Sequence, residues 1–225
     1  MLSRLAASAL FAGLGAGAFA TLLQLWFAVP LLMEGELYET GARTHFTATG
    51  GQSDAGVPDI WEEPARHLGS FGTNLIAWTG FALLLIAGFV LARRWGHEVT
   101  ARLGLVWGLA GFLAVHLAPA IGLPPELPGT IGAELGARQA WWTLAVGASA
   151  LGLGLLAFGP GPAWIALGAL SLLLPHVIGA PHTGAYFGVA PPELAAHFAT
   201  ASLGVAAASW ALLGALAGAL WSRGG

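Results

Sequence analysis

Long apolar runs separated by short polar segments make up almost the whole chain. A helix needs about 20 apolar residues to cross the hydrocarbon core of a bilayer. Candidate runs can be bracketed at residues 5–33, 69–92, 103–123, 139–158, 163–180 and 195–221. We therefore predict an all-α fold, a polytopic membrane protein built as a bundle of six transmembrane helices. Five spans are the alternative, because Pro175 interrupts the run at 163–180 and a re-entrant segment there would not cross.

The composition supports a membrane protein. Hydrophobic residues make up 56% of the chain and charged residues only 8%, whereas about a quarter of the residues of a soluble domain are charged. The chain has no cysteine and no lysine, which excludes disulfides, thiolate metal ligands, thiol catalysis and the lysine of a Walker A loop. We predict a single transmembrane domain over residues 1–225, which is not an enzyme and has no resident cofactor.

The arginines predict an orientation, because cytoplasmic segments of membrane proteins carry an excess of basic residues. With six spans, the arginines on one side are Arg4, Arg93, Arg94, Arg102 and Arg223, and those on the other are Arg43, Arg66 and Arg138. We therefore expect both termini to be cytoplasmic. The segment 34–67, which contains seven of the acidic residues, would then be an extracytoplasmic acidic loop.

Prolines and small residues suggest how the helices are arranged. Pro30, Pro119 and Pro175 lie near the predicted outer ends of spans one, three and five, and the tetrapeptide PPEL occurs twice. This pattern suggests repeated helical hairpins, although proline also simply marks loop entry. Close helix packing is expected at three glycine pairs with i, i+4 spacing. These pairs are Gly13/Gly17, Gly104/Gly108 and Gly214/Gly218.

Imidazole and carboxylate groups gather on the predicted outer face and indicate a metal path. Proline inside a helix frees the carbonyl four residues earlier, and transporters commonly build ion sites at such broken helices. Glu193 and His197, spaced i, i+4, share one face of a helix. The candidate metal ligands are His116, Glu126, His176, His182, Glu193 and His197. Such ligands suit Co, Ni, Zn or Mn, and their chemistry alone does not select one.

Several motifs resemble the CbtA family of predicted bacterial cobalt transporter subunits. They are VPLLMEGELYE, GLVWGLAGF, LAPAIGLPPELPG, LGARQAWW, LPHVIGAPH and PPELAAHFATASL. The resemblance implies a protein of the bacterial cytoplasmic membrane that takes up cobalt for cobalamin synthesis. It also implies a partner, a small single-span subunit of the CbtB type. We expect contact with the lipid bilayer and no nucleic-acid partner, and the oligomeric state stays open.

Two other functions use some of the same residues. A haem-binding membrane anchor would use His116 and His176, but their predicted places at helix ends are shallow for a haem held between helices. A rhomboid-like intramembrane protease would use Ser149 and His197. The segment GASA lacks the glycine expected after that serine, and the two residues fall at different predicted depths.

Overall fold

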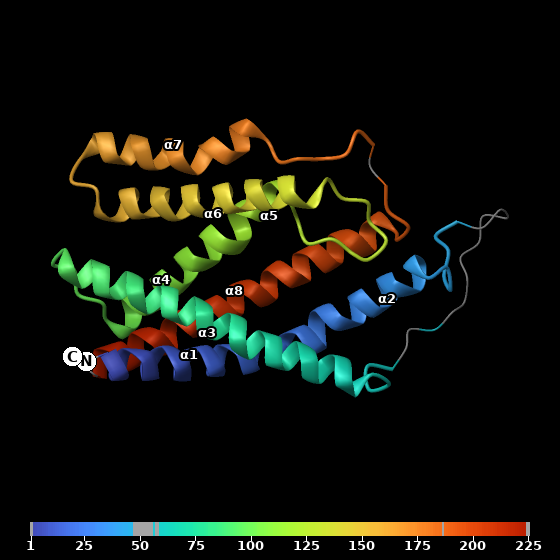
Figure 1. Cartoon of the computed structure of the whole chain (residues 1–225), viewed down its shortest axis with the longest axis horizontal. Coiled ribbons are helices and arrows are strands. Elements are labelled where there is room, and N and C mark those ends of the chain that lie inside the picture. The colour runs from blue at the N-terminus through green and yellow to red at the C-terminus, as the bar shows by residue number, and fades with distance from the viewer. Residues whose placement is uncertain (1, 47–55, 57–58, 186, 224–225) are drawn as a thin grey trace. The chain divides into compact units, whose positions relative to one another are not determined.

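The fold was analysed on a computed structural model, which describes residues 2–46, 56, 59–185 and 187–223. The described residues form helices and no strand, which confirms the all-α prediction (Figure 1). In chain order the elements are α1 (Leu2–Leu23), the π-helical segment η1 (Gln24–Ala28), α2 (Val29–Glu39), α3 (Pro64–Arg94), α4 (Ala101–Phe112), the π-helical segment η2 (Leu113–Leu117), α5 (Ala118–Gly122), α6 (Leu135–Phe158), α7 (Pro162–Ile178) and α8 (Pro192–Arg223).

Within the described ranges, five helical stretches are long and apolar enough to cross a membrane. They are Ser3–Glu39, Pro64–Arg94, Ala101–Gly122, Leu135–Phe158 and Pro192–Arg223. The sixth helix, α7, is apolar but has only 17 residues, a length of about 25 Å at 1.5 Å per residue. The predicted six helices are therefore present, and α7 is the short one that the alternative of five spans singled out.

The first helix runs beyond its predicted end. The run predicted at 5–33 continues to Glu39, so the first acidic residues of the predicted 34–67 loop are helical. Thr40 closes this helix by donating its backbone N–H and its Oγ1 hydroxyl to the carbonyl of Glu36, both at 2.9 Å. Arg43 then folds back onto Glu34, with Nη1 2.7 Å from Oε1. The connection from α2 to α3 spans residues 40–63, of which 47–55 and 57–58 lie outside the described part of the chain.

Two of the three prolines are accommodated by π-helical segments. η1 ends two residues before Pro30, and η2 ends two residues before Pro119. A π segment shifts the backbone hydrogen bonding from i→i+4 to i→i+5, so the helix continues through a position where proline removes a donor. Pro175 instead lies inside α7, with no π segment before it. Spans one and three thus share a π segment before their proline, and the repeat of helical hairpins stays a prediction.

Residues cluster into two compact units, which we describe separately. Unit 1 comprises Met1–Phe27, Ile60–Phe112 and Gly204–Gly225. Unit 2 comprises Ala28–Asp59 and Leu113–Leu203.

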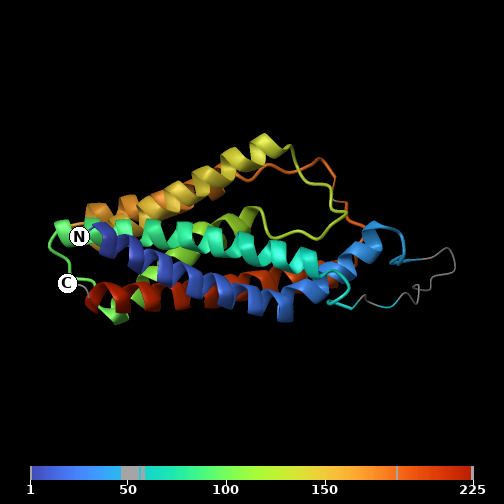
Figure 2. The ribbon, with the colours of Figure 1, turned by 60° about the horizontal axis from the view of Figure 1, so that its bottom comes forward.

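Glycines bring the helices of unit 1 into backbone contact, as predicted. α1 and α3 pack side by side (Figure 2), and a Cβ added at Gly17 would lie 2.9 Å from the carbonyl oxygen of Asn74. α4 packs on α8 in the same way, since a Cβ at Gly214 would lie 2.7 Å from the Cα of Gly108. A Cβ at Gly104 would lie 2.6 Å from the Cα of Gly218. All three predicted glycine pairs therefore face a neighbouring helix.

A polar cluster also joins α1 to α3 in unit 1. Asn74 donates its side-chain N–H groups to Thr21 Oγ1 at 3.0 Å and to Gln24 Oε1 at 2.6 Å. Thr21 in turn donates its hydroxyl to the carbonyl of Gly17 at 2.9 Å. Gln24 is the first residue of η1, so this cluster holds the point where the first helix changes its hydrogen-bonding pattern.

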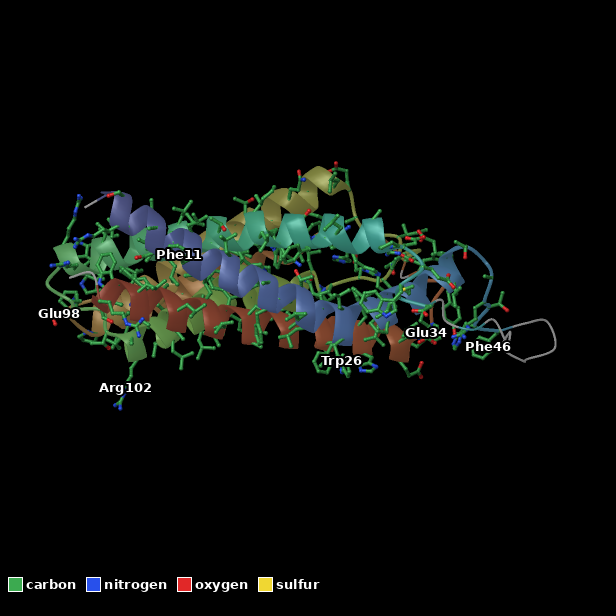
Figure 3. The ribbon with its side chains drawn as sticks, turned by 90° about the horizontal axis from the view of Figure 1, so that it is seen from below. Phe11, Trp26, Glu34, Phe46, Glu98 and Arg102 are labelled. Atoms are coloured by element: carbon green, nitrogen blue, oxygen red, sulfur yellow. The ribbon has the colours of Figure 1, made fainter. Side chains whose placement is uncertain are left out.

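Five arginines share one end of unit 1. Arg4 lies at the start of α1, Arg93 and Arg94 end α3, Arg102 begins α4 and Arg223 ends α8. The antiparallel packing of these helices brings the ends together (Figures 1 and 2), and Figure 3 labels Arg102 and Glu98 at this end. The predicted grouping of the basic residues is therefore present within this unit.

Unit 2 is organised around the pair α6 and α7, which lie side by side (Figure 1). Gly152 and Gly168 allow close approach, since a Cβ at either glycine would lie within 2.9 Å of the other's carbonyl oxygen. Ser171 donates its hydroxyl to the carbonyl of Ala148 at 2.8 Å. The segments flanking these helices meet in an isolated antiparallel bridge between Thr130 and Gly188.

The α4–α8 contact yields a first prediction. Gly214→Ala places a Cβ against the backbone of α4, which cannot yield as a flexible side chain would. We expect a loss of stability of about 1–3 kcal/mol, measured as a lower midpoint of thermal unfolding in detergent. Gly204→Ala, on the same helix, is the matched control because a Cβ there meets nothing within 4 Å. Equal unfolding midpoints for the two variants would show that the close contact is absent.

Candidate functional site

A cavity of about 320 Å³ lies within unit 2 and contains two of the predicted ligands. Its polar lining comes from His116 in η2, Glu126 after α5 and Arg138 in the first turn of α6. Trp142, one turn further along α6, and Leu203 on α8 also contribute. The rest of the wall is built by Val115, Pro119, Ala120, Leu123, Pro124 and Pro125.

His116 reaches this cavity from the π-helical segment. It is half-buried and lies three residues before Pro119, which is itself buried. The π segment inserts an extra residue into the turn that carries the imidazole, and such insertions frequently occur at functional sites. The local sequence thus places a metal-binding type of side chain at an irregularity of the helix.

Glu126 is held by an ion pair across the loop between α5 and α6. Arg138 Nη2 lies 2.7 Å from Glu126 Oε2, and the side chains are 31% and 29% exposed. Gly132 makes room for this pair, because a Cβ there would lie 2.5 Å from Arg138 Nη1. The guanidinium therefore lies against the loop backbone and neutralises the carboxylate on the cavity wall.

The first turn of α6 is fixed by Glu134. Its carboxylate accepts hydrogen bonds from the backbone N–H groups of Gly136 at 2.8 Å and Ala137 at 2.7 Å. These two bonds stabilise the charged form and lower the pKa of Glu134. The carbonyl of Glu134 also accepts the backbone N–H of Arg138 at 3.1 Å. The backbone that carries Arg138 is thus well defined, while its side chain reaches the cavity.

The other predicted ligands have different surroundings. The ring of His176, near the end of α7, packs edge-on against Trp141, with ring centroids 6.1 Å apart. His182 is exposed, and its Nδ1 lies 3.0 Å from the carbonyl of Ala180. Glu193 and His197 occupy the first turns of α8 and are both exposed.

Among the described residues, no three histidine or acidic side chains are grouped closely enough to hold a metal ion. The structure brings only His116 and Glu126 to the same cavity wall. The wider six-residue set remains a prediction.

Sequence reasoning missed two residues of this cavity, Arg138 and Trp142. Arg138 was used only in the count of arginines on each side and as part of the family motif LGARQAWW, and Trp142 only as part of that motif. A signal was available for the first, because Glu126 and Arg138 have opposite charges and flank the same short loop. For Trp142 the signal was its i, i+4 spacing from Arg138 at the start of a helix.

The residues of the two alternative functions are not brought together in the described ranges. The Ser149 hydroxyl is buried and makes no hydrogen bond there, so it forms no serine–histidine pair with the exposed His197. His116 lines the cavity, whereas His176 is not among the lining residues. These positions supply no support for a protease or for a haem held by both histidines.

No curated protein and no solved structure matches the chain. A protein-family model described as "Probable cobalt transporter subunit (CbtA)" matches residues 2–222, nearly the whole chain. Together with the five apolar helices, the match identifies a multi-pass membrane protein of a transport system. The chain belongs to the CbtA family of probable cobalt transporter subunits.

Proposed function

We propose that this subunit carries a divalent metal ion into the bacterial cell across the cytoplasmic membrane, with cobalt for cobalamin synthesis as the cargo. The observation that supports this most is the pairing of His116 and Glu126 on one cavity wall beside a π-helical segment. Imidazole and carboxylate together suit first-row divalent ions, and the chain has no thiolate to bind the ion more tightly. The affinity of such a site for a divalent ion is moderate, so the site can bind an ion and release it again.

The remaining candidate ligands would bind the same ion before it reaches this cavity. His176, His182, Glu193 and His197 all lie in or beside the connection between α7 and α8 in unit 2. In the proposed orientation that connection is extracytoplasmic, so these groups would meet the ion as it arrives. The family description as a subunit supports a partner, which we propose is a small single-span protein of the CbtB type.

The ligand proposal is tested by uptake measurements. Cells expressing His116→Ala or Glu126→Gln should accumulate cobalt about tenfold more slowly than wild type or worse, because each change removes a metal-binding group. His97→Ala, in the α3–α4 connection, is the control and should transport normally. Membrane abundance of every variant is measured in parallel. Normal uptake by both cavity variants at normal abundance would exclude this cavity from the ion path.

The orientation has its own test, which the lack of cysteine makes simple. Thr44→Cys, in the connection after α2, and Ser222→Cys, at the end of α8, each introduce one exposed thiol. With cytoplasmic termini, a membrane-impermeant maleimide added to intact cells should label position 44 and should label position 222 only after lysis. The reverse pattern would invert the proposed topology. Labelling of both in intact cells would contradict the odd number of crossings that six spans place between the two positions.

A further inference from the structure

We propose that Arg138 is a built-in competitor for the metal ion and that its guanidinium must leave Glu126 before the ion can bind. This inference rests on the proposed function of the cavity and assigns a role in affinity and selectivity to a residue that is not a ligand. The structure motivates it directly, because Arg138 and Glu126 form a 2.7 Å ion pair on the wall that also carries His116.

The first step is that this ion pair is able to open. The side chains of Arg138 and Glu126 are 31% and 29% exposed, so water can solvate either group when they separate. Ion pairs of this kind contribute little net stability. The backbone at Arg138 is meanwhile held by the hydrogen bond to Glu134. The exchange therefore requires a side-chain rotation and no change in the helix.

The second step is that the exchange favours divalent ions. A monovalent cation offers Glu126 the same charge as the guanidinium, which is tethered beside it at a high effective concentration. A divalent ion offers twice the charge and so a stronger attraction at equal distance. A transition-metal ion can also use the imidazole of His116, which sodium, potassium and magnesium ions use poorly. The guanidinium of Arg138 would thus prevent binding of abundant monovalent ions and of magnesium. It would also raise the concentration of the transported ion that is needed for binding.

The third step is that the loop is shaped to hold the guanidinium. A Cβ at Gly132 would lie 2.5 Å from Arg138 Nη1, 3.1 Å from its Cζ and 3.5 Å from Glu126 Oε2. A side chain at position 132 would therefore clash with the guanidinium of Arg138, whereas the carboxylate of Glu126 is far enough away for ordinary van der Waals contact. Gly132→Ala is thus a way to displace Arg138 while every charge is retained.

The experiment measures binding of Co²⁺ to the purified full-length chain in detergent by calorimetry. Arg138→Gln should bind Co²⁺ roughly three- to tenfold more tightly than wild type, because the competing cation is gone. Sodium chloride should also compete more effectively with Co²⁺ in this variant. Arg66→Gln is the matched control, because Arg66 pairs with Glu63 at 3.6 Å and does not line the cavity. The control should bind Co²⁺ as wild type does.

Two further variants separate the possible outcomes. In a Glu126→Gln background, Arg138→Gln should have no effect on Co²⁺ affinity, since the carboxylate for which the two cations compete is absent. If Arg138→Gln does not fold, the competitor role is tested with Gly132→Ala instead. This variant should bind Co²⁺ more tightly than wild type. Unchanged or weaker binding in the folded variant would overturn the competitor role and indicate an ion pair that only fastens the loop. The proposed site itself fails only if Glu126→Gln and His116→Ala both leave Co²⁺ binding unchanged.

Discussion

Backbone hydrogen bonding inside a bilayer constrains every helix of this chain, because hydrocarbon offers no partner to a freed carbonyl or amide. The two π-helical segments meet this constraint at Pro30 and Pro119, where a regular helix would lose a bond. They keep the helix continuous and change the register of the side chains beyond them. One of them carries His116 to the cavity. A backbone requirement is thus linked to the placement of the candidate ligand.

The bilayer also limits which interactions can hold the helices together. Lipid tails are as apolar as leucine, so apolar side chains gain little by leaving lipid for a neighbouring helix. Unit 1 instead brings backbones together at glycines, and adds the hydrogen bonds of Asn74 to Thr21 and Gln24. Many large apolar side chains, such as Leu84, Trp26 and Ile76, remain exposed. In water this would be a liability, and in a membrane it is the surface that lipid or a partner helix covers.

Hydrophobic pattern and glycine spacing were sufficient to predict the helices and their close contacts, because both follow from local sequence. The continuation of the first helix to Glu39 was not predicted, because it depends on Thr40 and on the ion pair of Arg43 with Glu34. The π segments were missed for a similar reason. Proline predicts a lost bond, but not whether the helix breaks there or shifts its hydrogen bonding. The candidate site was predicted only in part, since shared membrane depth does not determine which helix faces which.

The ion pairs distinguish the two groups of arginines. Arg43, Arg66 and Arg138, the three on the predicted outer side, each pair with a glutamate. None of the five at the shared end of unit 1 forms an ion pair within the described residues. The two groups of arginines therefore differ in their surroundings as well as in number, and the cytoplasmic location of the termini stays a prediction from the arginine count. Glu126 is likewise already paired with the guanidinium of Arg138, so an ion that uses the proposed site would have to displace this group from the carboxylate.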